Sequence, residues 1–416
     1  MDFASELKER GLVSHVSADV SKILGKTRAV YFGVDPTADS LHVGHLVPVL
    51  LMKRLADAGH KVIFLVGGGT GTIGDPKEKG ERPLLEISII NKNVRTLEKQ
   101  IRQVIGKWVL VVNNADWLGK VRLVDFLRDV GKHFTVNELI KRDLVRKRLE
   151  TPDESISYSE FSYALLQAYD FLVLNEKHGC DLQVGADDQW TNILSGVELI
   201  RKRTGKEVYA LTVPLVTDDN GKKFGKSEGN AVWLDPEKTS PFKFYQFWMN
   251  LPDKHVEAYL KIYTFLGLGE IKALMELHRR NPGAREAQKT LARLITETVH
   301  GKAAAINTEA TSEALFGTKP FSGLSSKEQK VALTEAPSLT IFHDDLEKGY
   351  GLADALSLGK LVSSKSEARR IITAKGVSVN GLPAENPDQK LSEKDFLGGY
   401  ALIRKGKRDV LILRVK

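Results

Sequence analysis

The sequence predicts an α/β protein in which a doubly wound parallel sheet is followed by a helical region and a small α+β module. Strand-like and helix-like stretches alternate from about Arg28 to Val216, as in doubly wound α/β domains. Lys61–Val66 is a continuous apolar run, which is typical of a parallel strand buried on both faces. Helical apolar spacing prevails from Ser240 to about Thr334, and the module begins at about Gly349.

The remaining elements of the sheet region are predicted from local patterns. Arg28–Phe32 and Gly205–Pro214 are expected strands, and Leu46–Ala58 has helical spacing. We expect Asp39 or Ser40 to cap that helix, because a side-chain oxygen there can accept a free backbone N–H. Sheets of this kind bind ligands beyond the carboxyl ends of their strands. Polar residues that follow strands are therefore candidate site residues.

The bulk composition narrows the class of protein. A chain of 416 residues is too long for one core and suggests two or three domains. Its 42% hydrophobic and 27% charged residues are ordinary for a globular protein, and no apolar run reaches the length of a membrane span. The acidic N-terminus is unlike a secretory signal, and the single cysteine, Cys180, excludes an internal disulfide framework. We expect a cytoplasmic protein.

Positive charge is concentrated at the C-terminal end. The chain carries a net charge of +8, and residues 349–416 hold 13 Lys/Arg against 7 Asp/Glu, a net of +6. Such concentration points to a polyanion, either nucleic acid or an anionic membrane surface. The alternative is a basic tail that only aids solubility.

Two histidines follow the first predicted strand. His42 and His45 are expected on the first turn of the next helix, where backbone N–H groups and the helix dipole favour phosphate. Gly44 has no side chain to keep a nucleotide from the backbone. A histidine pair is often structural instead. Zinc needs at least a third ligand, and Cys180 with scattered histidines forms no further cluster, so no metal site is predicted.

A basic loop lies about 180 residues further along. The segment Asp218–Gly229 contains Lys222, Lys223 and Lys226 among glycines. Glycines allow such a loop to move, and its ammonium groups could close over a polyphosphate in a transition state. The alternative is an exposed basic turn.

Two glycine-rich matches carry little weight. Gly69–Gly74 has dinucleotide-binding spacing, but Asp75 and Pro76 follow at once and disfavour a helix there. Gly225–Ser227 resembles the end of a P-loop, but Asn220 stands where the first glycine should be.

Together the histidine and lysine motifs resemble the HIGH and KMSKS sequences of class I aminoacyl-tRNA synthetases. The run Tyr31–His45 is similar to the bacterial-type tyrosyl-tRNA synthetases. The similarity extends through Gly67–Pro76, Phe126–Phe134, Glu160–Phe171 and Gln183–Trp190 and covers nearly the whole chain. It implies that tyrosine is activated with ATP to tyrosyl-adenylate plus pyrophosphate, then transferred to the 3′ end of its cognate tRNA. It also implies a homodimer, with Mg²⁺ accompanying ATP and no tightly bound cofactor.

The resemblance implies three domains. A Rossmann-like catalytic domain is expected at 1–220, and a helical domain that includes the lysine loop at 221–340. An RNA-binding domain of the ribosomal small-subunit-protein type is expected at 349–416. Ala336–Ser338 and His343–Lys348 are predicted as the connection before it.

One predicted helix carries a polar stripe. Tyr163, Gln167 and Asp170 are spaced to share a face of an otherwise apolar helix, which favours a polar pocket over exposure to water. By resemblance, Tyr163 and Gln167 with Asp75 would hold the α-ammonium of tyrosine. Tyr31 and Asp170 would contact its phenol, an arrangement that suits a hydroxyl donor.

The resemblance also assigns the nucleotide side of the site. The ribose and the activated carboxylate would be surrounded by Asp35, His45, Gln183, Asp188 and Gln189, and Gln189 also belongs to the tyrosine-binding set. Thr37, His42, Lys223 and Lys226 would stabilise the departing pyrophosphate, with Ser227 in the ATP-binding set. Lys79 and Arg82 match a basic pair that moves in the family, in a loop one residue shorter here. Three departures from the family pattern stand at Phe32, at Ala186 with Asp187, and at Ser227, which keeps the hydroxyl of a more usual threonine. We expect altered ATP affinity but not lost function.

The C-terminal module is predicted to bind RNA. Leu352–Ile372 suggests two helices joined near Val362, with Ser364 capping the second, and Gly376–Gly381 reads as a hairpin with an Asn-Gly turn. Arg404–Arg408 is a basic turn between apolar strands. Basic side chains on such a module suit phosphate contacts and RNA shape recognition. The predicted RNA-binding residues are Lys365, Arg369, Arg370, Arg404, Lys405, Lys407 and Arg408.

Three other readings stay open at this point. A tryptophan-specific relative is disfavoured by Asp170 with Tyr31 and by the basic module. An NAD-dependent oxidoreductase would use the Gly69–Gly74 run, which Pro76 opposes. A non-catalytic RNA-binding protein with a retained synthetase fold is disfavoured by the intact histidine and lysine motifs.

Overall fold

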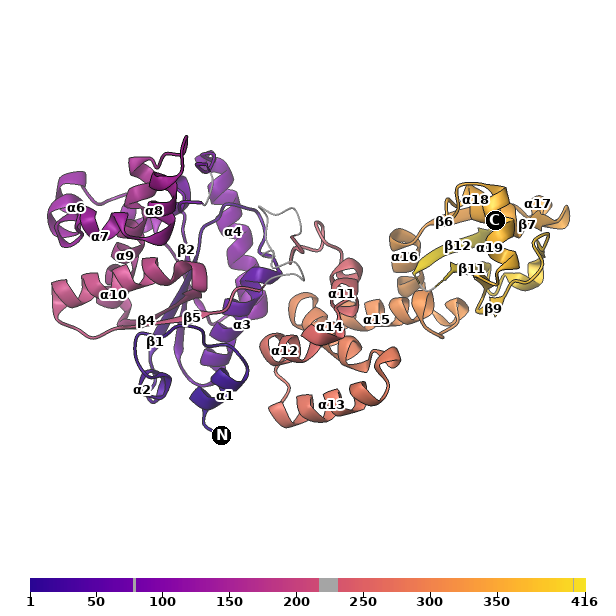
Figure 1. The fold of residues 1–416 in the computed structure, drawn as a ribbon, viewed down its shortest axis with the longest axis horizontal. Helices are drawn as coiled ribbons and strands as arrows, with labels where there is room; N and C mark the ends of the chain where they lie inside the picture. The colour runs from indigo at the N-terminus through magenta and orange to yellow at the C-terminus, as the bar shows by residue number, and fades with distance from the viewer. Residues whose placement is uncertain (78–79, 217–230, 407) are drawn as a thin grey trace. The chain divides into compact units, whose positions relative to one another are not determined.

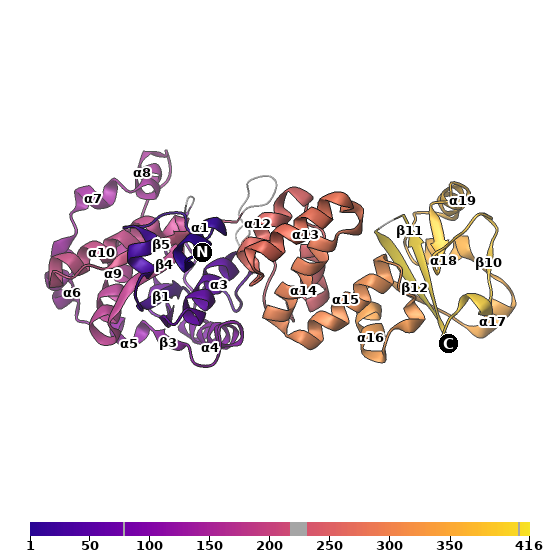
Figure 2. The same cartoon turned by 90° about the horizontal axis from the view of Figure 1, so that it is seen from below.

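The structure, a computed structural model, describes residues 1–77, 80–216, 231–406 and 408–416. The chain divides into two compact units (Figures 1 and 2). Unit 1 comprises Met1–Lys238 and Pro252–Arg280, and unit 2 comprises Thr239–Leu251 and Asn281–Lys416. The domain boundaries expected from the sequence stay predictions. No helix within the described ranges has the length and apolar character that a bilayer span requires.

Unit 1 is built on a five-stranded parallel sheet of order β3-β2-β1-β4-β5. The strands are β1 (Ala29–Val34), β2 (Lys61–Val66), β3 (Leu110–Asn113), β4 (Cys180–Ala186) and β5 (Tyr209–Val213). β2 and β3 lie in succession on one side of β1, and β4 and β5 lie in succession on its other side. This order confirms the predicted doubly wound sheet, and its reversal between β1 and β4 is where such sheets bind ligands.

Helices cover both faces of this sheet. α3 (Val43–Asp57) and α4 (Ile87–Val104) lie on one face, while α9 (Tyr158–His178) and α10 (Trp190–Thr204) lie on the other (Figure 1). α9 begins with a capping box between Ser157 and Glu160. The predicted polar stripe therefore lies on a helix that packs directly against the sheet.

The helix of the histidine motif begins later than predicted. His42, not Asp39 or Ser40, is the N-cap residue of α3. Asp39 instead forms an ion pair with Lys238 at 2.8 Å, and the Ser40 hydroxyl donates to the Leu41 carbonyl at 2.8 Å. The backbone around Leu41 pairs with residues 232–234, and that pairing keeps it extended.

Two further helices of unit 1, α12 (Asp253–Tyr263) and α13 (Leu268–Arg280), follow the excursion of the chain into unit 2. The end of α12 is held by buried arginines. Arg10 donates to the Lys261 carbonyl at 3.1 Å and to the Leu266 carbonyl at 2.6 Å, while Arg54 of α3 donates to the Thr264 carbonyl. These bonds satisfy carbonyl groups that a helix end leaves free. They also attach α12 to the helix that begins at the histidines.

The helical part of unit 2 confirms the helical region predicted from the sequence. Its helices are α11 (Pro241–Met249), α14 (Glu286–His300), α15 (Lys302–Phe316) and α16 (Ser326–Glu335). Trp248 and Phe244 of α11 are fully buried, and Phe244 packs edge-on against His300 with ring centroids 4.8 Å apart.

The C-terminal part of unit 2 is a mixed sheet of order β6-β12-β11-β8-β9, with α18 (Leu352–Leu358) and α19 (Lys365–Thr373) packed beside it. The strands are β6 (Ser338–Ile341), β8 (Val377–Val379), β9 (Leu382–Pro383), β11 (Tyr400–Lys405) and β12 (Asp409–Val415). The predicted hairpin is confirmed, since Asn380 and Gly381 have φ of +50° and +85° between β8 and β9. Ser364 caps α19 as predicted.

The segment predicted as a connection is structured. Ser338 begins β6, which pairs in parallel with β12, and His343–Glu347 forms the short helix α17. The apolar members of Ser338–Ile341 supply an edge strand, and its partner β12 lies more than 60 residues later in the chain. A local pattern in the sequence does not predict that pairing.

Candidate active site

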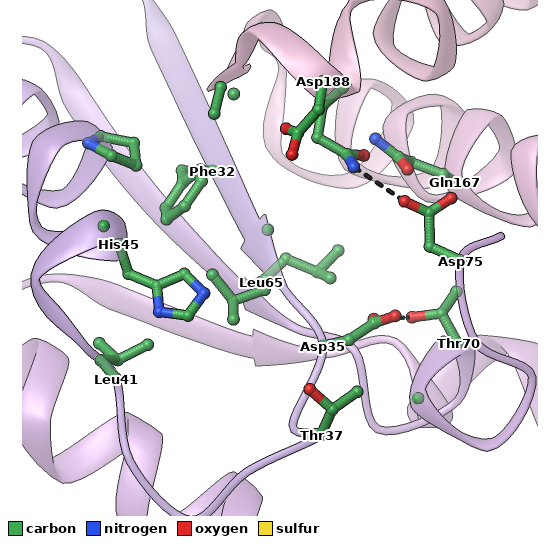
Figure 3. A pocket seen from close by; sticks show the side chains of 18 of the residues that line it. Phe32, Asp35, Thr37, Leu41, His45, Leu65, Thr70, Asp75, Gln167 and Asp188 are labelled. Atoms are coloured by element: carbon green, nitrogen blue, oxygen red, sulfur yellow. Dashed lines mark hydrogen bonds between the residues drawn. The ribbon is translucent and has the colours of Figure 1, made fainter. Parts of the chain in front are cut away.

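A cavity of about 560 Å³ opens in unit 1 where β1 and β4 end. All described residues that the sequence assigned to tyrosine or ATP line it: Tyr31, Asp35, Thr37, His42, His45, Asp75, Arg82, Tyr163, Gln167, Asp170, Gln183, Asp188 and Gln189. Figure 3 shows His45 on one side and Asp75, Gln167 and Asp188 on the other. Lys79, Lys223, Lys226 and Ser227 lie outside the described residues.

Asp170 and Tyr31 are deeply buried polar residues that line the cavity. The Asp170 carboxylate accepts hydrogen bonds from Trp117 Nε1 at 2.7 Å and Asn114 Nδ2 at 2.9 Å. Burial raises the pKa of Asp170 to about 7. The Tyr31 hydroxyl is buried and has no hydrogen-bond partner among the described residues. A ligand hydroxyl placed here would meet an acceptor and an unpaired phenol.

Asn114 and Trp117 were not predicted as site residues. Asn114 follows directly after β3, as site residues of such sheets often do. The four-residue strand before it is too short to stand out in the sequence. No local sequence pattern predicts a site role for Trp117, because the partner of its indole N–H, Asp170, lies on α9.

Two further carboxylates face the cavity, and each is held by neutral donors. Asp35 accepts from Thr70 Oγ1 at 2.7 Å (Figure 3). It also accepts from the Tyr163 hydroxyl at 2.8 Å. Asp75 accepts from Gln189 Nε2 at 2.8 Å. Burial raises the pKa of both, and that of Asp75 reaches about 6. Carboxylates gathered in one enclosed space favour a cationic ligand group.

The glycine run before Asp75 makes room for this cluster. A Cβ atom on Gly67 would lie only 2.0 Å from Asp35 Oδ1 and 2.4 Å from Thr70 Oγ1. Only the short 3-10 turn Thr70–Thr72 follows, and the chain at Asp75 is irregular. The structure thus agrees that no dinucleotide-type helix opens here.

The histidine motif forms a reciprocal cap at the start of α3. His42 Nδ1 accepts the Gly44 N–H at 3.1 Å, and His45 Nδ1 accepts the His42 N–H at 3.3 Å. Burial lowers the pKa of His42 to about 4 and that of His45 well below its usual 6.5. Both rings are therefore neutral near pH 7. Because each Nδ1 accepts, each Nε2 carries the hydrogen and offers a donor without charge.

The segment after the lysine loop is paired with the histidine motif. The Val43 N–H donates to the Val232 carbonyl at 3.0 Å, and the Leu234 N–H donates to the Leu41 carbonyl at 2.9 Å. Between them, the Trp233 ring meets the His42 ring edge-on, with centroids 5.9 Å apart. Trp233 also lines the cavity, although no motif in the sequence predicts it as a site residue.

The departures from the family pattern that lie within the described residues have different surroundings. Phe32 and Ala186 line the cavity, and Phe32 packs against Phe64 with ring centroids 5.7 Å apart. Asp187 is not among the lining residues. Its carboxylate accepts from Thr212 Oγ1 at 2.6 Å and Ser14 Oγ at 2.7 Å, and so ties the N-terminal segment to β5.

The predicted RNA-binding residues fall into two groups. Arg370, Arg408, Lys365 and Arg369 are exposed, and the last two also form ion pairs with Asp354 and Asp388, respectively. Arg404 instead donates to the Leu315 and Ala314 carbonyls at the end of α15, both at 2.9 Å. Lys405 donates to the Leu361 carbonyl. These two cations have donors committed within unit 2, and Lys407 lies outside the described residues.

Family comparison accounts for nearly the whole chain. Residues 25–317 match the family described as tRNA synthetases class I (W and Y). Residues 328–413 match the Tyrosine--tRNA ligase SYY-like C-terminal domain. The two matches meet within the helices of unit 2.

Relatives with the same organisation are found in several bacteria. The chain is 44% identical over 419 residues to a tyrosine–tRNA ligase of Roseiflexus castenholzii, covering 99% of this chain and 98% of that protein. It is 43% identical over 422 residues to the Klebsiella pneumoniae tyrosine–tRNA ligase, with the same two coverages.

A solved structure supports the same relationship. A C-terminally truncated mitochondrial tyrosyl-tRNA synthetase of Aspergillus nidulans superposes with a TM-score of 0.69 at 34% identity, covering 76% of this chain and 94% of that one. A tryptophanyl-tRNA synthetase of Encephalitozoon cuniculi shares only the fold, at 17% identity and a TM-score of 0.53. The chain belongs to the bacterial-type tyrosyl-tRNA synthetases of the class I (W and Y) family.

Proposed function

We propose that this protein activates tyrosine with ATP and transfers the tyrosyl group to the 3′ end of its tRNA. The observation that carries the proposal is a single cavity lined by both predicted sets of residues, for tyrosine and for ATP. The tyrosine carboxylate attacks the α-phosphorus, and pyrophosphate leaves. A hydroxyl at the tRNA 3′ end then takes the tyrosyl group from the adenylate. No protein nucleophile is needed, so the protein acts through position and electrostatics.

The buried carboxylates suggest how tyrosine would lie. Its phenol would donate to Asp170 and meet the Tyr31 hydroxyl, which has no partner among the described residues. Its ammonium would lie between Asp75, Gln167 and Tyr163. Because the Tyr163 hydroxyl donates to Asp35, its oxygen keeps lone pairs for the ammonium.

The opposite side of the cavity would hold ATP. The Nε2–H groups of His42 and His45 would donate to phosphate oxygens, with Thr37 beside them. Asp35, Gln183 and Asp188 would contact the ribose and the activated carboxylate. Positive charge would come from Arg82 and from three lysines outside the described residues, Lys79, Lys223 and Lys226. Ser227, also outside those residues, would add a hydroxyl donor. Mg²⁺ would arrive with ATP.

Three finer proposals concern the setting of the enzyme. The exposed cations Lys365, Arg369, Arg370 and Arg408 would contact tRNA phosphates, in the predicted RNA-binding domain at 349–416. A homodimer would cover exposed apolar side chains such as Leu123 and Val124, which are 71% and 69% exposed. By family, the protein would work in the cytoplasm.

Amino-acid-dependent exchange of pyrophosphate into ATP tests the proposal. Tyrosine, tryptophan and phenylalanine should be compared in parallel with the full-length protein, followed by charging of tRNA. We expect exchange with tyrosine and little with the other two. Folded protein that shows no tyrosine-stimulated exchange would overturn the proposal, and preferential exchange with tryptophan would reassign the substrate.

A further inference from the structure

Arg142 reaches from the start of one helix into the side of another. It is the residue before α8 (Asp143–Glu150), and its side chain points to α10. One guanidinium nitrogen donates to Asn192 Oδ1 at 3.2 Å, and the other donates to the buried Ser195 hydroxyl. Neither Arg142 nor Asn192 lines the cavity. Arg142 can therefore affect the reaction only through the residues that it contacts.

Asn192 passes the contact on to the cavity. Its Nδ2 donates to Asp75 Oδ1 at 3.1 Å and to Gln189 Oε1 at 3.3 Å. Gln189 Nε2 in turn donates to Asp75 Oδ2 at 2.8 Å. Both carboxylate oxygens of Asp75 thus accept from side-chain amides.

The guanidinium sets the direction of these amides. If the Asn192 amide were reversed, its oxygen would face the Asp75 carboxylate and its NH₂ group would face Arg142, so both contacts would become repulsive. Arg142 has no acceptor and therefore permits only one orientation. Asn192 then fixes the Gln189 amide in the same way. A planar guanidinium with two parallel donors is suited to this task, whereas a lysine is not.

The groups around Asp75 have opposite effects on its pKa. Asp35 disfavours its ionised form, as does burial, while Arg82 and the two amides favour it. Arg142 adds positive charge from the far side of Asn192, and its own pKa is lowered to about 10 by burial although Asp75 acts to raise it. Tyr163 is neutral, since burial raises its pKa well above 10. The ionised form of Asp75 is therefore favoured by few groups, namely Arg82 and the two amides.

We propose that Arg142 and Asn192 are positioning residues that orient Asp75 and Gln189 for the α-ammonium group of the amino-acid substrate. The inference rests on the proposed function, since it takes the ligand to be an amine held by Asp75. It assigns to this pair the recognition of the amine, not of the phenol or the nucleotide. The pair acts without touching the substrate.

Two inhibitors separate amine recognition from general damage. Tyrosinol carries the phenol and the ammonium, and 3-(4-hydroxyphenyl)propan-1-ol is the same molecule without the amine. In Arg142→Met, inhibition of exchange by tyrosinol should weaken by about tenfold or more, as for a lost hydrogen bond to a charged group. Inhibition by the amine-free alcohol should stay within about twofold, because its contacts at Asp170 are unchanged.

Matched variants accompany the test. Arg146→Met removes an exposed arginine of α8 whose one ion pair among the described residues is with Asp143 at 3.0 Å, and it should leave inhibition by both compounds unchanged. Arg142→Lys keeps the positive charge but lacks the two parallel donors of the guanidinium. Its inhibition by tyrosinol should lie between those of the wild type and Arg142→Met. If Arg142→Met does not fold, Asn192→Ala carries the same comparison.

The outcomes distinguish this inference from the proposed function. Wild-type protein without tyrosine-dependent exchange would overturn the function itself. With an active wild type, equal weakening of both inhibitors, or weakening of neither, would overturn the positioning role.

Discussion

Val43 and Val232, which lie 189 positions apart in the chain, are joined by a 3.0 Å backbone hydrogen bond. Val43 is the first residue of α3, and Val232 follows the predicted lysine loop by a few positions. The chain that leaves the lysine motif is thus fixed to the entry of the histidine helix. Trp233 and His42 meet at the same place, with ring centroids 5.9 Å apart. This pairing is a structural support for the start of α3.

Replacing Trp233 tests that support. Trp233→Leu removes the ring that packs against His42 but leaves the backbone pairing available. We expect kcat of pyrophosphate exchange to fall roughly three- to tenfold, as for the loss of one aromatic contact. KM for tyrosine should stay within about twofold, because Asp170 and Asp75 are not touched. Trp108→Leu, which removes a 59% exposed indole, is the control and should change neither constant.

The neutral histidines make a second prediction. His42→Asn keeps an acceptor that can cap α3 but removes the Nε2 donor. We expect kcat of exchange to fall roughly ten- to a hundredfold, with the free energy of unfolding changed by less than about 1 kcal/mol. Steady-state kinetics and urea denaturation measure the two quantities.

The pH profile checks the charge state of His42. Its pKa of about 4 means that the ring gains charge only well below neutral pH. An acid limb of the wild-type rate between pH 6 and pH 7 should therefore belong to the buried carboxylates, Asp75 with a pKa of about 6 and Asp170 with a pKa of about 7. It should persist in His42→Asn. Disappearance of that limb in the variant would show that a histidine titrates there instead.

The sequence predicts most of the fold because its elements carry local signals. The strand at Lys61–Val66 is a continuous apolar run, and α9 begins with a capping box at Ser157. The errors fall where pairing is between distant segments. The predicted start of α3 is wrong because Leu41 is held extended by residue 234, and β6 is not predicted because its partner is β12. Neither partner can be identified from a local pattern.

The same distinction holds for the candidate site. Tyr163, Gln167 and Asp170 could be grouped from helical spacing alone, since all lie on α9. Asn192 lies on α10 and Arg142 precedes α8. Only the fold brings Asn192 into contact with Asp75 and Arg142 into contact with Asn192. Arg404 is a contrasting case, because the fold gives it contacts that its place in the sequence does not suggest. Its place in a basic turn suggests RNA contact, whereas its guanidinium caps the end of α15.

Asp170 should make stability depend on pH. Its pKa is raised from 3.8 to about 7, so the folded state binds its proton more tightly than the unfolded chain does. Stability from this group is present at low pH and is lost as pH rises towards 7. Between pH 5 and pH 8, Asp170→Asn should gain roughly 2–3 kcal/mol in free energy of unfolding relative to wild type. Urea denaturation without ligands measures this difference, and parallel curves for the two proteins would contradict it.

Asp170 should also decide between tyrosine and phenylalanine. Asp170→Ala removes the acceptor for the substrate phenol and leaves Trp117 and Asn114 without their shared partner. We expect kcat/KM for tyrosine to fall by at least about tenfold, while that for phenylalanine changes less, because phenylalanine has no hydroxyl to lose a bond. Exchange assays with both amino acids give the ratio. An unchanged ratio would mean that Asp170 does not contact the phenol.

The exposed cations of α19 should serve charging but not activation. In a triple variant with Lys365, Arg369 and Arg370 each changed to Glu, three phosphate contacts would become repulsive, while the cavity of unit 1 keeps its residues. We expect tRNA charging to fall by at least about a hundredfold near physiological salt, with pyrophosphate exchange within about twofold of wild type. Lys254→Glu, Lys261→Glu and Lys272→Glu, on α12 and α13, form a control with the same change of charge and should charge tRNA far better. Equal loss in both triple variants would assign the effect to net charge, and loss of exchange would contradict the division of labour.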